Sequence, residues 1–408
     1  MGKNGNLVVG LDLGTTKTCA IVGEMHGDGL DVIGFASAPS KGLRKGMVIN
    51  IESTVEAIAK VVEEAELMAG CRITSAYTGI AGSHIKGFNS HGVIGIKDSE
   101  VSKHDINRVI EAARAIAIPQ DREVLHILPQ EFIVDDQEGI HDPLGMCGVR
   151  LEARVHMVTS AASSAQNIIK CANRTGLAVK ELVLQPLASS ASTIYEDEKE
   201  LGVVLVDIGG GTTDIAVIKG GSIRYTSVLA LGGDHITSDI AVGLRTSLKQ
   251  AEELKIQYGS ARSGPDEKDE TIEIAALGGG GTRTVSRKFL CRIIQSRVEE
   301  IFTLVRKEIA KSGYREFMTP GVVLTGGTSL LQGITESAER ILDLSVRVGY
   351  PNTVGGLCEI VKSPIYATAV GLILYGRNRT SDSNRSRGYK SMCSGLVRAA
   401  KNWLAEVV

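Results

Sequence analysis

The stretch VDIGGGTTD, residues 206–214, follows the apolar run VVL (203–205) and precedes IAVI (215–218). Glycine and aspartate both disfavour strand interiors, so this pattern predicts two buried strands joined by a tight turn. Backbone N–H groups exposed at a glycine-rich turn form a concave site for an anion. An aspartate beside it suits Mg²⁺, which prefers carboxylate, water and phosphate oxygens. A plain glycine turn explains one such stretch equally well.

The stretch has a second copy near the start of the chain. VVGLDLGTTKTCAIVG (8–23) also reads apolar strand, Asp-x-Gly turn, two threonines and apolar strand. We align Asp12 with Asp207, and Thr15-Thr16 with Thr212-Thr213 after a two-glycine insertion. Two matched copies favour a duplicated phosphate hairpin, with two related lobes facing one nucleotide. The GxxxxGK[ST] pattern of the P-loop is not present in the sequence.

A third glycine motif is VVLTGGTSLL (322–331), an apolar strand followed by Gly326-Gly327 and the start of a helix. Thr328 or Ser329 is expected to cap that helix, and the glycines allow a base or ribose to approach the backbone. Taken alone, the motif is explained equally well by an ordinary strand-to-helix turn.

Composition excludes several classes of function. The 408 residues carry a net charge of −2, so no overall field attracts nucleic acid, and the length suits two or more lobes. Seven dispersed cysteines without a CxxC pair indicate reduced thiols, and the eight histidines show no metal-ligand spacing. We expect neither a signal peptide nor a membrane-spanning segment.

Helical patterns separate the motifs. Ser53 to Glu56 reads as a capping box that opens a helix closed by Gly70, and Ser102 opens another. A helix over about 285–311 should bury Phe289, Ile293, Ile301, Val305 and Ile309. Polar residues and glycines over 259–284 predict a flexible hairpin.

The tail has a different composition. Residues 377–393 are polar and predict a disordered linker, and residues 377–408 carry seven basic against two acidic side chains. At about 100° per residue, 394–408 forms a helix with one apolar face. That face holds Leu396, Val397, Ala400, Trp403, Leu404, Val407 and Val408. We predict binding to an anionic membrane surface; docking on the protein's own core is disfavoured, because the long linker makes it entropically costly.

The three glycine motifs, in this order, resemble the actin/DnaK-type chaperone/sugar kinase superfamily. Residues 12–17 and 207–214 are similar to its two phosphate loops, and 326–328 to its adenosine loop. LVLQPLASS (182–190) and PIYATAVGLILYG (364–376) resemble its two connecting segments. AEELK (251–255) resembles the helix that approaches the adenosine.

Within the superfamily, GIAGSHIKGFNSHGVIGI (79–96) and ALGGDHITSDIA (230–241) resemble the FtsA family of bacterial actin-like cell-division proteins. The resemblance implies an α/β actin-like two-lobed ATPase fold, built from a duplicated β-sheet and helix core, with an extra subdomain. It places subdomain 1A at 6–85, 159–200 and 364–376, the inserted subdomain 1C at 86–158, subdomain 2A at 201–235 and 305–363, and subdomain 2B at 236–304.

The resemblance also assigns roles to residues, with ATP and Mg²⁺ as cofactors. Asp12 and Asp207 act through the metal and its waters, and Gln185 and Asp214 orient an attacking water if hydrolysis occurs; the rate is left open. The expected nucleotide contacts are Gly14, Thr15, Thr16, Lys17, Gly209, Gly210, Gly211, Thr212, Thr213, Gly232, Gly233, Glu252, Lys255, Gly326, Gly327 and Thr328.

The implied function is a polymerising protein that tethers the ring of the tubulin-like protein FtsZ to the cytoplasmic face of the inner membrane and helps recruit other division proteins. Subdomain 2B would receive the C-terminal peptide of FtsZ, with Arg287 and Arg297 as candidate contacts; a solvated basic helix face is as good an explanation for either arginine. One alternative is a small-molecule kinase of the same superfamily. A peptide-binding chaperone is disfavoured because no further substrate domain fits after the last motif.

Overall fold

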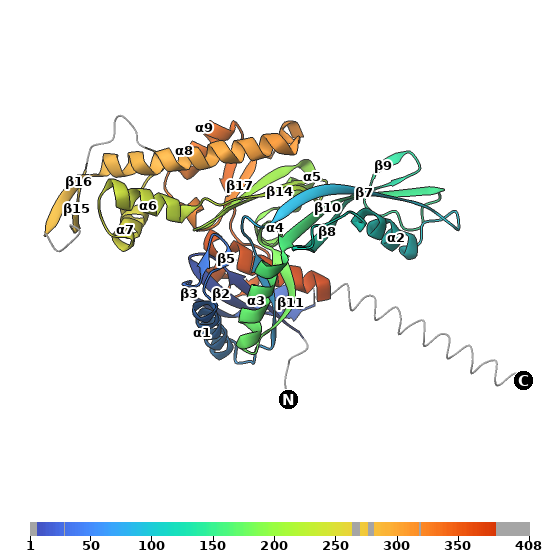
Figure 1. Ribbon diagram of the computed structural model, residues 1–408, viewed down its shortest axis with the longest axis horizontal. Coiled ribbons are helices and arrows are strands. Elements are labelled where there is room, and N and C mark those ends of the chain that lie inside the picture. The colour runs from blue at the N-terminus through green and yellow to red at the C-terminus, as the bar shows by residue number, and fades with distance from the viewer. Residues whose placement is uncertain (1–5, 28, 263–269, 276–280, 318–319, 381–408) are drawn as a thin grey trace, which may run out of the picture.

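Two sheets form the centres of two lobes in the computed structural model (Figure 1), which describes all residues except 1–5, 28, 263–269, 276–280, 318–319 and 381–408. The sheet of lobe 1 has the order β11-β6-β1-β2-β3-β19, and that of lobe 2 the order β14-β13-β12-β17-β18. Lobe 1 contains β1 (Leu7–Leu13), β2 (Lys17–His26), β3 (Gly29–Pro39), β4 (Leu43–Arg44), β5 (Met47–Val48), α1 (Ile51–Ala69), β6 (Ser75–Ile80), α3 (Ala162–Arg174), β11 (Ala178–Leu184), α4 (Gln185–Thr193) and β19 (Gly355–Gly356).

Lobe 2 repeats the topology of lobe 1. In each sheet two antiparallel pairings are followed by two parallel ones, β3-β2-β1-β6-β11 in one lobe and β14-β13-β12-β17-β18 in the other. Its elements are β12 (Val203–Ile208), β13 (Thr213–Lys219), β14 (Ser222–Leu229), α6 (Gly233–Gly243), α7 (Leu248–Tyr258), β15 (Thr271–Ala275), β16 (Thr282–Ser286), α8 (Arg287–Ser312), η1 (Arg315–Phe317), β17 (Val322–Thr325), η2 (Gly327–Leu330), α9 (Ile334–Leu342) and β18 (Val346–Val348). The duplicated α/β core predicted from the two hairpins is therefore present.

The register of the two hairpins corrects our sequence alignment. Gly14 N–H donates to the Lys17 carbonyl and Gly209 N–H to the Thr212 carbonyl, each at 2.9 Å. Each turn is therefore closed by a hydrogen bond between a glycine and the third residue after it, so the two turns have the same length. No two-glycine insertion exists: Thr15-Thr16 corresponds to Gly210-Gly211.

Both faces of each sheet are covered. In lobe 1, α1 and α3 pack on one face and the helix over residues 367–380 on the other. In lobe 2, α6, α7, α8 and α9 cover one face, while Ile194 and Ile223 belong to the cluster on the other. The remaining short helices are α5 (Glu196–Leu201), α10 (Cys358–Val361) and η3 (Pro364–Tyr366).

Helix boundaries confirm two expectations and correct two. A helix begins after Ser102 as predicted, since Ser102 caps α2 (Lys103–Arg114) with a capping box, and α8 begins after Ser286. The first helix, however, begins at Ile51 with Asn50 as its cap, because the Asn50 side chain accepts from Ser53 N–H at 3.1 Å. Phe289, expected in the core, is 45% exposed, since it lies in the first turn of α8 beyond the sheet.

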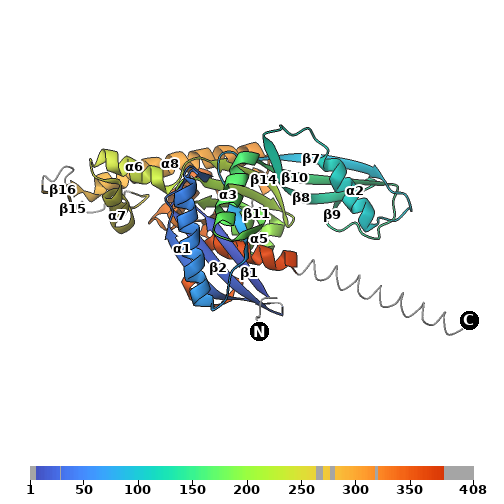
Figure 2. The ribbon, with the colours of Figure 1, turned by 60° about the horizontal axis from the view of Figure 1, so that its bottom comes forward.

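A third sheet, with the order β7-β10-β8-β9, projects from the two lobes (Figure 2). It consists of β7 (Lys86–Gly95), β8 (Arg122–Val134), β9 (Gln137–Ile140) and β10 (Arg150–Ala161), and α2 covers one of its faces with an apolar cluster. The chain enters it after β6 and leaves it before α3. We take this sheet and α2 as the inserted subdomain; the sheet runs from Lys86 to Ala161, three residues beyond the segment 86–158 that the resemblance assigns to it.

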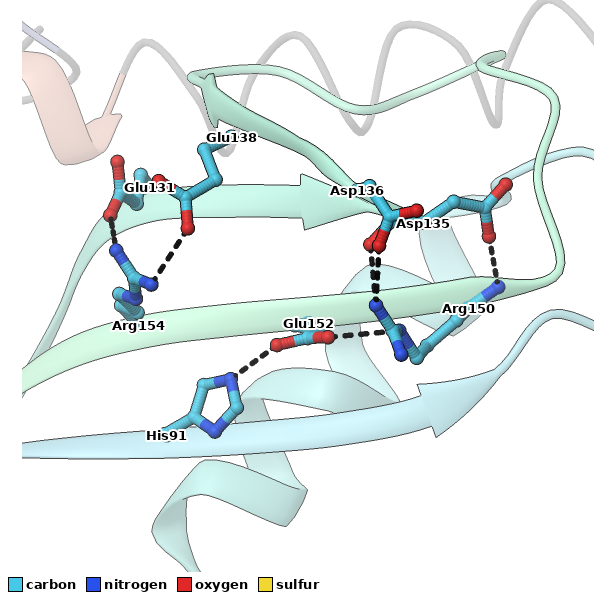
Figure 3. Close-up of polar contacts among 8 residues, drawn as sticks. All are labelled: His91, Glu131, Asp135, Asp136, Glu138, Arg150, Glu152 and Arg154. Atoms are coloured by element: carbon cyan, nitrogen blue, oxygen red, sulfur yellow. Dashed lines mark hydrogen bonds and ion pairs between the residues drawn. The ribbon is translucent and has the colours of Figure 1, made fainter.

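The opposite face of the inserted sheet is charged and paired within itself (Figure 3). Arg154 bridges Glu131 and Glu138 at 2.6 and 3.0 Å. Arg150 and His91 both contact Glu152, at 2.9 and 2.7 Å. Side chains alternate between the two faces of a strand, so Glu152 and Arg154 lie on this face while the intervening Leu151, Ala153 and Val155 are buried on the other.

The chain returns to lobe 1 earlier than predicted, because β19 at residues 355–356 pairs with β3 there, within the range 305–363 assigned to lobe 2. The last described helix continues to residue 380, and Arg379 contacts Glu181 at 3.3 Å, so the linker predicted from residue 377 begins no earlier than 381. The amphipathic segment 394–408 lies outside the described residues. No helix in the described part of the chain is long and apolar enough to cross a membrane.

Candidate functional site

A cavity of about 490 Å³ lies between the two lobes. Residues from both hairpins, from α7 and from the third glycine motif line it. The predicted site residues that it brings together are Asp12, Gly14, Thr15, Thr16, Lys17, Gln185, Asp207, Gly209, Gly210, Gly211, Thr212, Asp214, Gly233, Glu252, Lys255, Gly326, Gly327 and Thr328. Segments more than 300 residues apart in the chain thus form one site.

The two hairpin tips face each other at very short range. A Cβ atom on Gly210 would lie 1.8 Å from Thr16 Oγ1, and one on Gly211 would lie 2.5 Å from Thr15 Oγ1. Only glycine fits at these two positions, because real Cβ atoms never approach other atoms so closely. The glycines therefore allow backbone N–H groups of lobe 2 to lie beside threonine hydroxyls of lobe 1.

On the lobe 1 side, Lys17 and Asp12 form an ion pair with 3.2 Å between Nζ and Oδ2. Lys17 Nζ also donates to the Ile365 carbonyl at 2.7 Å, and Gln185 Nε2 donates to Asp12 Oδ1 at 3.2 Å. Burial by itself would lower the pKa of Lys17, but the charge of Asp12 and the hydrogen bond to it keep that pKa above its ordinary value. The ammonium thus stays charged inside the cavity.

Asp207 is the corresponding residue of lobe 2. Its Oδ2 accepts from Ser189 at 2.6 Å and from Thr368 at 3.3 Å. Burial, and then the charge of Asp12, raise the pKa of Asp207, while the Ser189 hydroxyl opposes this. Gly326, with φ +83°, leaves room for the carboxylate, since a Cβ there would lie 2.4 Å from Asp207 Oδ1.

Asp214 carries a buried oxygen, Oδ1, without a hydrogen-bond partner, whereas Oδ2 accepts from Thr212 at 3.0 Å. Burial and the charge of Asp207 raise the pKa of Asp214 to about 8. Three carboxylates around one cavity, one of them with an orphaned oxygen, fit a divalent cation. The described residues contain no group of three or more His, Cys, Asp or Glu ligands close enough to hold a metal by themselves; Mg²⁺ in proteins usually keeps several waters and takes phosphate oxygens as further ligands.

The far end of the cavity is formed by α7 and the third glycine motif. Lys255 pairs with Glu252 at 2.6 Å and donates to Thr237 Oγ1 at 2.9 Å. Thr328 Oγ1 donates to the Gly209 carbonyl at 3.1 Å, which ties the third motif to the lobe 2 hairpin. Neither Thr328 nor Ser329 caps the next α-helix as expected, because a 3₁₀ turn intervenes and α9 begins at Ile334.

Two expected site residues do not line the cavity. Thr213 is fully buried, and its hydroxyl donates to the Leu231 carbonyl at 2.9 Å. Its neighbours Thr212 and Asp214 line the cavity, and side chains alternate along β13, so the Thr213 side chain points away from the cavity. Gly232 lies behind Gly233 and donates its N–H to His235 at 3.2 Å. Residues that line the cavity without having been predicted include Gly46, Asp234, Ile256, Gln332, Ile365 and Thr368. Of these, only Asp234 had a signal in the sequence, a carboxylate directly after two glycines.

The two candidate partner-binding arginines are already engaged. Arg297 forms a bidentate pair with Asp239 of α6, at 2.6 and 3.0 Å, and a second ion pair with Glu300 at 2.5 Å. Arg287 Nε donates to the Tyr258 carbonyl at 3.1 Å. A partner carboxylate would therefore compete with groups of this chain, above all at Arg297.

Solved structures with the same architecture define the class of fold. The chain superposes on a "PilM-PilN type IV pilus biogenesis complex" with a TM-score of 0.66 at 20% identity, over 90% of this chain and 98% of that one. It superposes on "MreB5 of Spiroplasma citri bound to ADP" with a TM-score of 0.58 at 13% identity, over 93% and 99%. The fold is the two-lobed actin-like ATPase fold.

Sequence comparison identifies the family. The family model "Cell division protein FtsA" matches residues 204–371, and "SHS2 domain inserted in FTSA" matches residues 82–159. The chain is 51% identical to the cell division protein FtsA of Pseudomonas aeruginosa, over 93% of this chain and 91% of that protein. It is 41% identical to FtsA of Escherichia coli K12, over 98% and 97%. The chain belongs to the FtsA family of cell division proteins.

Proposed function

We propose that this protein binds Mg·ATP between its lobes, assembles into filaments, and attaches the FtsZ ring and other division proteins to the cytoplasmic face of the inner membrane at the division site. The observation that carries the nucleotide proposal is the pair of glycine hairpins that face each other across a cavity lined by Asp12, Asp207 and Asp214. It is supported by the similar fold of Spiroplasma citri MreB5 proteins solved with ADP and with AMPPNP.

Each part of the cavity has a distinct task in this proposal. The hairpin N–H groups, the threonine hydroxyls and Lys17 hold phosphates, while Asp12 and Asp207 hold the waters of a magnesium ion. That ion, when bound, neutralises phosphate charge. Gln185 and Asp214 orient a water, and positioning of this kind carries most of the catalysis in phosphoryl transfer. Glu252 and Lys255 lie at the adenosine end.

The nucleotide proposal is tested by titrating Mg·ATP into Asp207→Ala and wild type by calorimetry. Removal of the carboxylate should weaken binding by about tenfold or more, since one lost charge-assisted contact is worth about 1.5–3 kcal/mol. Asp136→Ala, an exposed aspartate on the inserted subdomain, is the matched control and should bind like wild type. Equal affinity for all three proteins contradicts the assignment.

For the membrane, we propose that the apolar face of 394–408, with Trp403, inserts at the headgroup boundary. A helix this short is marginal in water, so it folds on binding, and many copies along a filament make the attachment firm. Deletion of 394–408, or Trp403→Glu, should abolish sedimentation with anionic vesicles and leave ATP affinity unchanged. Sedimentation of the deletion variant equal to wild type rules out the tail as the anchor.

For assembly, we propose head-to-tail contacts between copies, which propagate because they do not close into a ring. ATP bridges the two lobes and selects one lobe arrangement, so assembly should depend on the nucleotide. Light scattering at increasing protein concentration, with and without Mg·ATP, measures this. No concentration-dependent rise in scattering under any nucleotide condition contradicts assembly into filaments.

For the FtsZ peptide, the Arg297–Asp239 pair provides a two-way test. If a peptide carboxylate binds Arg297, then Asp239→Ala frees the guanidinium and should strengthen binding, whereas Arg297→Glu should weaken it. Fluorescence anisotropy with a labelled C-terminal peptide of FtsZ reports both changes. Unchanged affinity in the two variants removes Arg297 from the site.

A further inference from the structure

The inserted subdomain belongs to lobe 1 by its chain connections but contacts lobe 2 with its strands. Its two covalent links run from β6 into β7 and from β10 into α3, both in lobe 1. Three of its strands, β7, β8 and β10, nevertheless contact β14, the edge strand of the lobe 2 sheet. Figures 1 and 2 both show β14 beside the base of the inserted sheet.

Gln130 of β8 makes the first contact with lobe 2. Its Nε2 donates to the backbone carbonyls of Ile223 and Arg224 on β14, at 3.1 and 3.2 Å, and to Asn89 Oδ1 at 3.2 Å. The Gln130 side chain is almost fully buried. A buried amide that binds backbone carbonyls of another lobe fixes position, because an unsatisfied group would cost free energy if the contact opened.

His156 of β10 makes the second contact. Its Nδ1 lies 2.7 Å from Asn89 Oδ1, and its Nε2 lies 2.8 Å from Thr226 Oγ1 on β14. Because the Asn89 amide oxygen only accepts, Nδ1 donates to it and Nε2 accepts the hydroxyl proton of Thr226. Both ring nitrogens of the buried, neutral imidazole are thus satisfied, Nδ1 within the inserted subdomain and Nε2 across the interface with lobe 2.

Gly87 shows how close the two parts are. A Cβ at this position of β7 would lie 2.3 Å from Thr226 Oγ1 and 2.7 Å from His156 Nε2. The bare backbone therefore lets β7 approach the Asn89–His156–Thr226 contact, and larger residues would push β14 away.

The contacts with lobe 1 lie at the roots of the strands. Arg122, the first residue of β8, donates through Nη2 to the His84 carbonyl at 2.9 Å and to the Thr159 carbonyl at 2.8 Å. Its guanidinium thus joins the incoming connection at His84 to the last part of β10 at Thr159. His126, also near the start of β8, accepts from Leu184 N–H of lobe 1 at 3.0 Å.

The positions of these contacts along the strands decide which lobe orients the inserted subdomain. Gln130 lies four residues further out along β8 than His126, and His156 lies two residues further out along β10 than Val158, which is buried in the lobe 1 core. At about 3.3 Å per residue these separations give lever arms of about 13 and about 7 Å. A rotation about the root leaves the Arg122 contacts nearly unchanged but would pull apart the contacts with β14.

We infer that the inserted subdomain moves as one body with lobe 2, held by Gln130 and by the Asn89–His156–Thr226 contact, and pivots against lobe 1 at the Arg122 clamp. Any change in the angle between the lobes then reorients the inserted subdomain relative to lobe 1, although its chain emerges from lobe 1. The inference does not depend on nucleotide binding, so it stands or falls separately from the proposed function.

Distances between spin labels in the nucleotide-free full-length protein test this directly. Cys147 is exposed on the inserted subdomain and takes one label. The second label is placed on lobe 2 at Lys307→Cys or on lobe 1 at Glu63→Cys. The background carries serine in place of Cys71 and Cys358, which are partly exposed, and in place of Cys393. Double electron–electron resonance should give a narrow distance distribution between labels at residues 147 and 307 and a broader one between labels at residues 147 and 63.

The variant that breaks the lobe 2 contacts is the double change Thr226→Val and Gln130→Ala. It should lose the narrow 147–307 distribution, whereas Thr226→Ser, which keeps the hydroxyl, should retain it. Thr284→Val, an exposed threonine on β16, is the matched control and should behave like wild type. Equal widths for both pairs in the wild type, or no change in a folded double variant, overturns the inference.

Arg122→Lys provides an independent variant in case the double change unfolds the protein. Lysine keeps the charge but cannot bridge the His84 and Thr159 carbonyls with one planar group. The 147–63 distribution should broaden while the 147–307 distribution stays narrow. Broadening of both pairs would show that the inserted subdomain is held by lobe 1 instead.

Discussion

Gly326 is the residue whose lack of a side chain most directly shapes the cavity. It has a positive φ of 83° and lies where a Cβ would be 2.4 Å from Asp207 Oδ1 and 2.5 Å from the Ile208 carbonyl. Alanine would therefore strain the backbone and displace the carboxylate together. The third glycine motif thus serves the geometry of the lobe 2 hairpin as well as its own turn.

Gly326→Ala should reduce Mg·ATP affinity by about tenfold or more, because Asp207 moves, and should lower the melting temperature. Gly70→Ala is the matched control: Gly70 also has a positive φ, 63°, but nothing lies within 4 Å of its Cβ position. That control should cost about 1 kcal/mol of stability from the backbone alone and leave affinity unchanged. Equal losses of affinity in both variants would show that only strain matters.

Two buried histidines make the stability depend on pH. Burial lowers the pKa of His126 and of His156 to about 4. Arg379 adds to the effect at His126, Glu181 lies 4.0 Å from that ring, and the His156 ring faces only uncharged partners. The unfolded chain therefore takes up protons between about pH 6.5 and 4 that the folded protein excludes.

The contribution of each neutral histidine is complete above pH 6.5 and is lost as the pH falls toward 4. It amounts to about 3 kcal/mol per residue. The difference in melting temperature between wild type and His126→Gln, whose amide oxygen can still accept from Leu184 N–H, isolates this contribution from that of Asp214, whose raised pKa acts with the opposite sign. That difference should be constant from pH 7 to 8 and should shift in favour of the variant as the pH falls below about 6. An identical pH profile for wild type and variant would contradict the assignment.

At the scale of elements, the start of α1 separates local pattern from local structure. Ser53 and Glu56 satisfy the capping-box pattern, yet Asn50 has the extended backbone of a cap and accepts from Ser53 N–H. The helix therefore begins one turn earlier than the pattern predicts. Asn50 also accepts from the Thr54 hydroxyl through its carbonyl, at 2.7 Å.

Asn50→Ala should destabilise lobe 1 by about 1 kcal/mol, the usual value of a lost N-cap hydrogen bond. Ser53→Ala should have almost no effect, because Ser53 is in the first turn of α1 and contributes only its backbone N–H to the cap. Denaturant unfolding followed by circular dichroism compares the two variants. A larger loss for Ser53→Ala than for Asn50→Ala would restore the sequence-based boundary.

At the scale of the whole molecule, two apolar cores meet at a polar cavity. The main core of lobe 2 and the main core of lobe 1 are separate clusters, and the facing hairpins belong one to each lobe. A ligand that contacts both hairpins couples the two lobes, because it loses its contacts with one of them when the lobes separate.

Mg·ATP at 100 times its dissociation constant should therefore stabilise the protein by about 2.7 kcal/mol. In calorimetry this should appear as one sharper transition at a higher temperature, because both lobes gain the same ligand. Lys17→Ala removes the cation that binds Asp12 and should abolish most of the shift. A shift confined to part of the heat absorption would show that the ligand binds one lobe only.

The sequence by itself determined the class of fold and predicted most of the motif residues that line the cavity between the lobes. Asp-x-Gly turns between apolar strands leave few local alternatives, and their repetition in 8–23 and 203–221 required two similar lobes. Gly210, Gly211, Gly326 and Lys17 could be recognised because their chemistry depends on residue type and on neighbours in the chain. The presence of helices could also be predicted from neighbouring residues alone, as the helix that begins after Ser102 shows.

Only the tertiary structure decided which residues meet across long distances in the chain. Thr213 and Gly232 fit the motifs but do not line the cavity, and the Thr213 side chain points away from it. Ile365 and Thr368 do line the cavity, because the chain has returned to lobe 1 at these residues. Packing also set the equal length of the two hairpins and paired Arg297 with Asp239. The physical reason is that strand pairing and burial, which depend on the whole chain, choose among arrangements that local sequence leaves nearly equal in free energy.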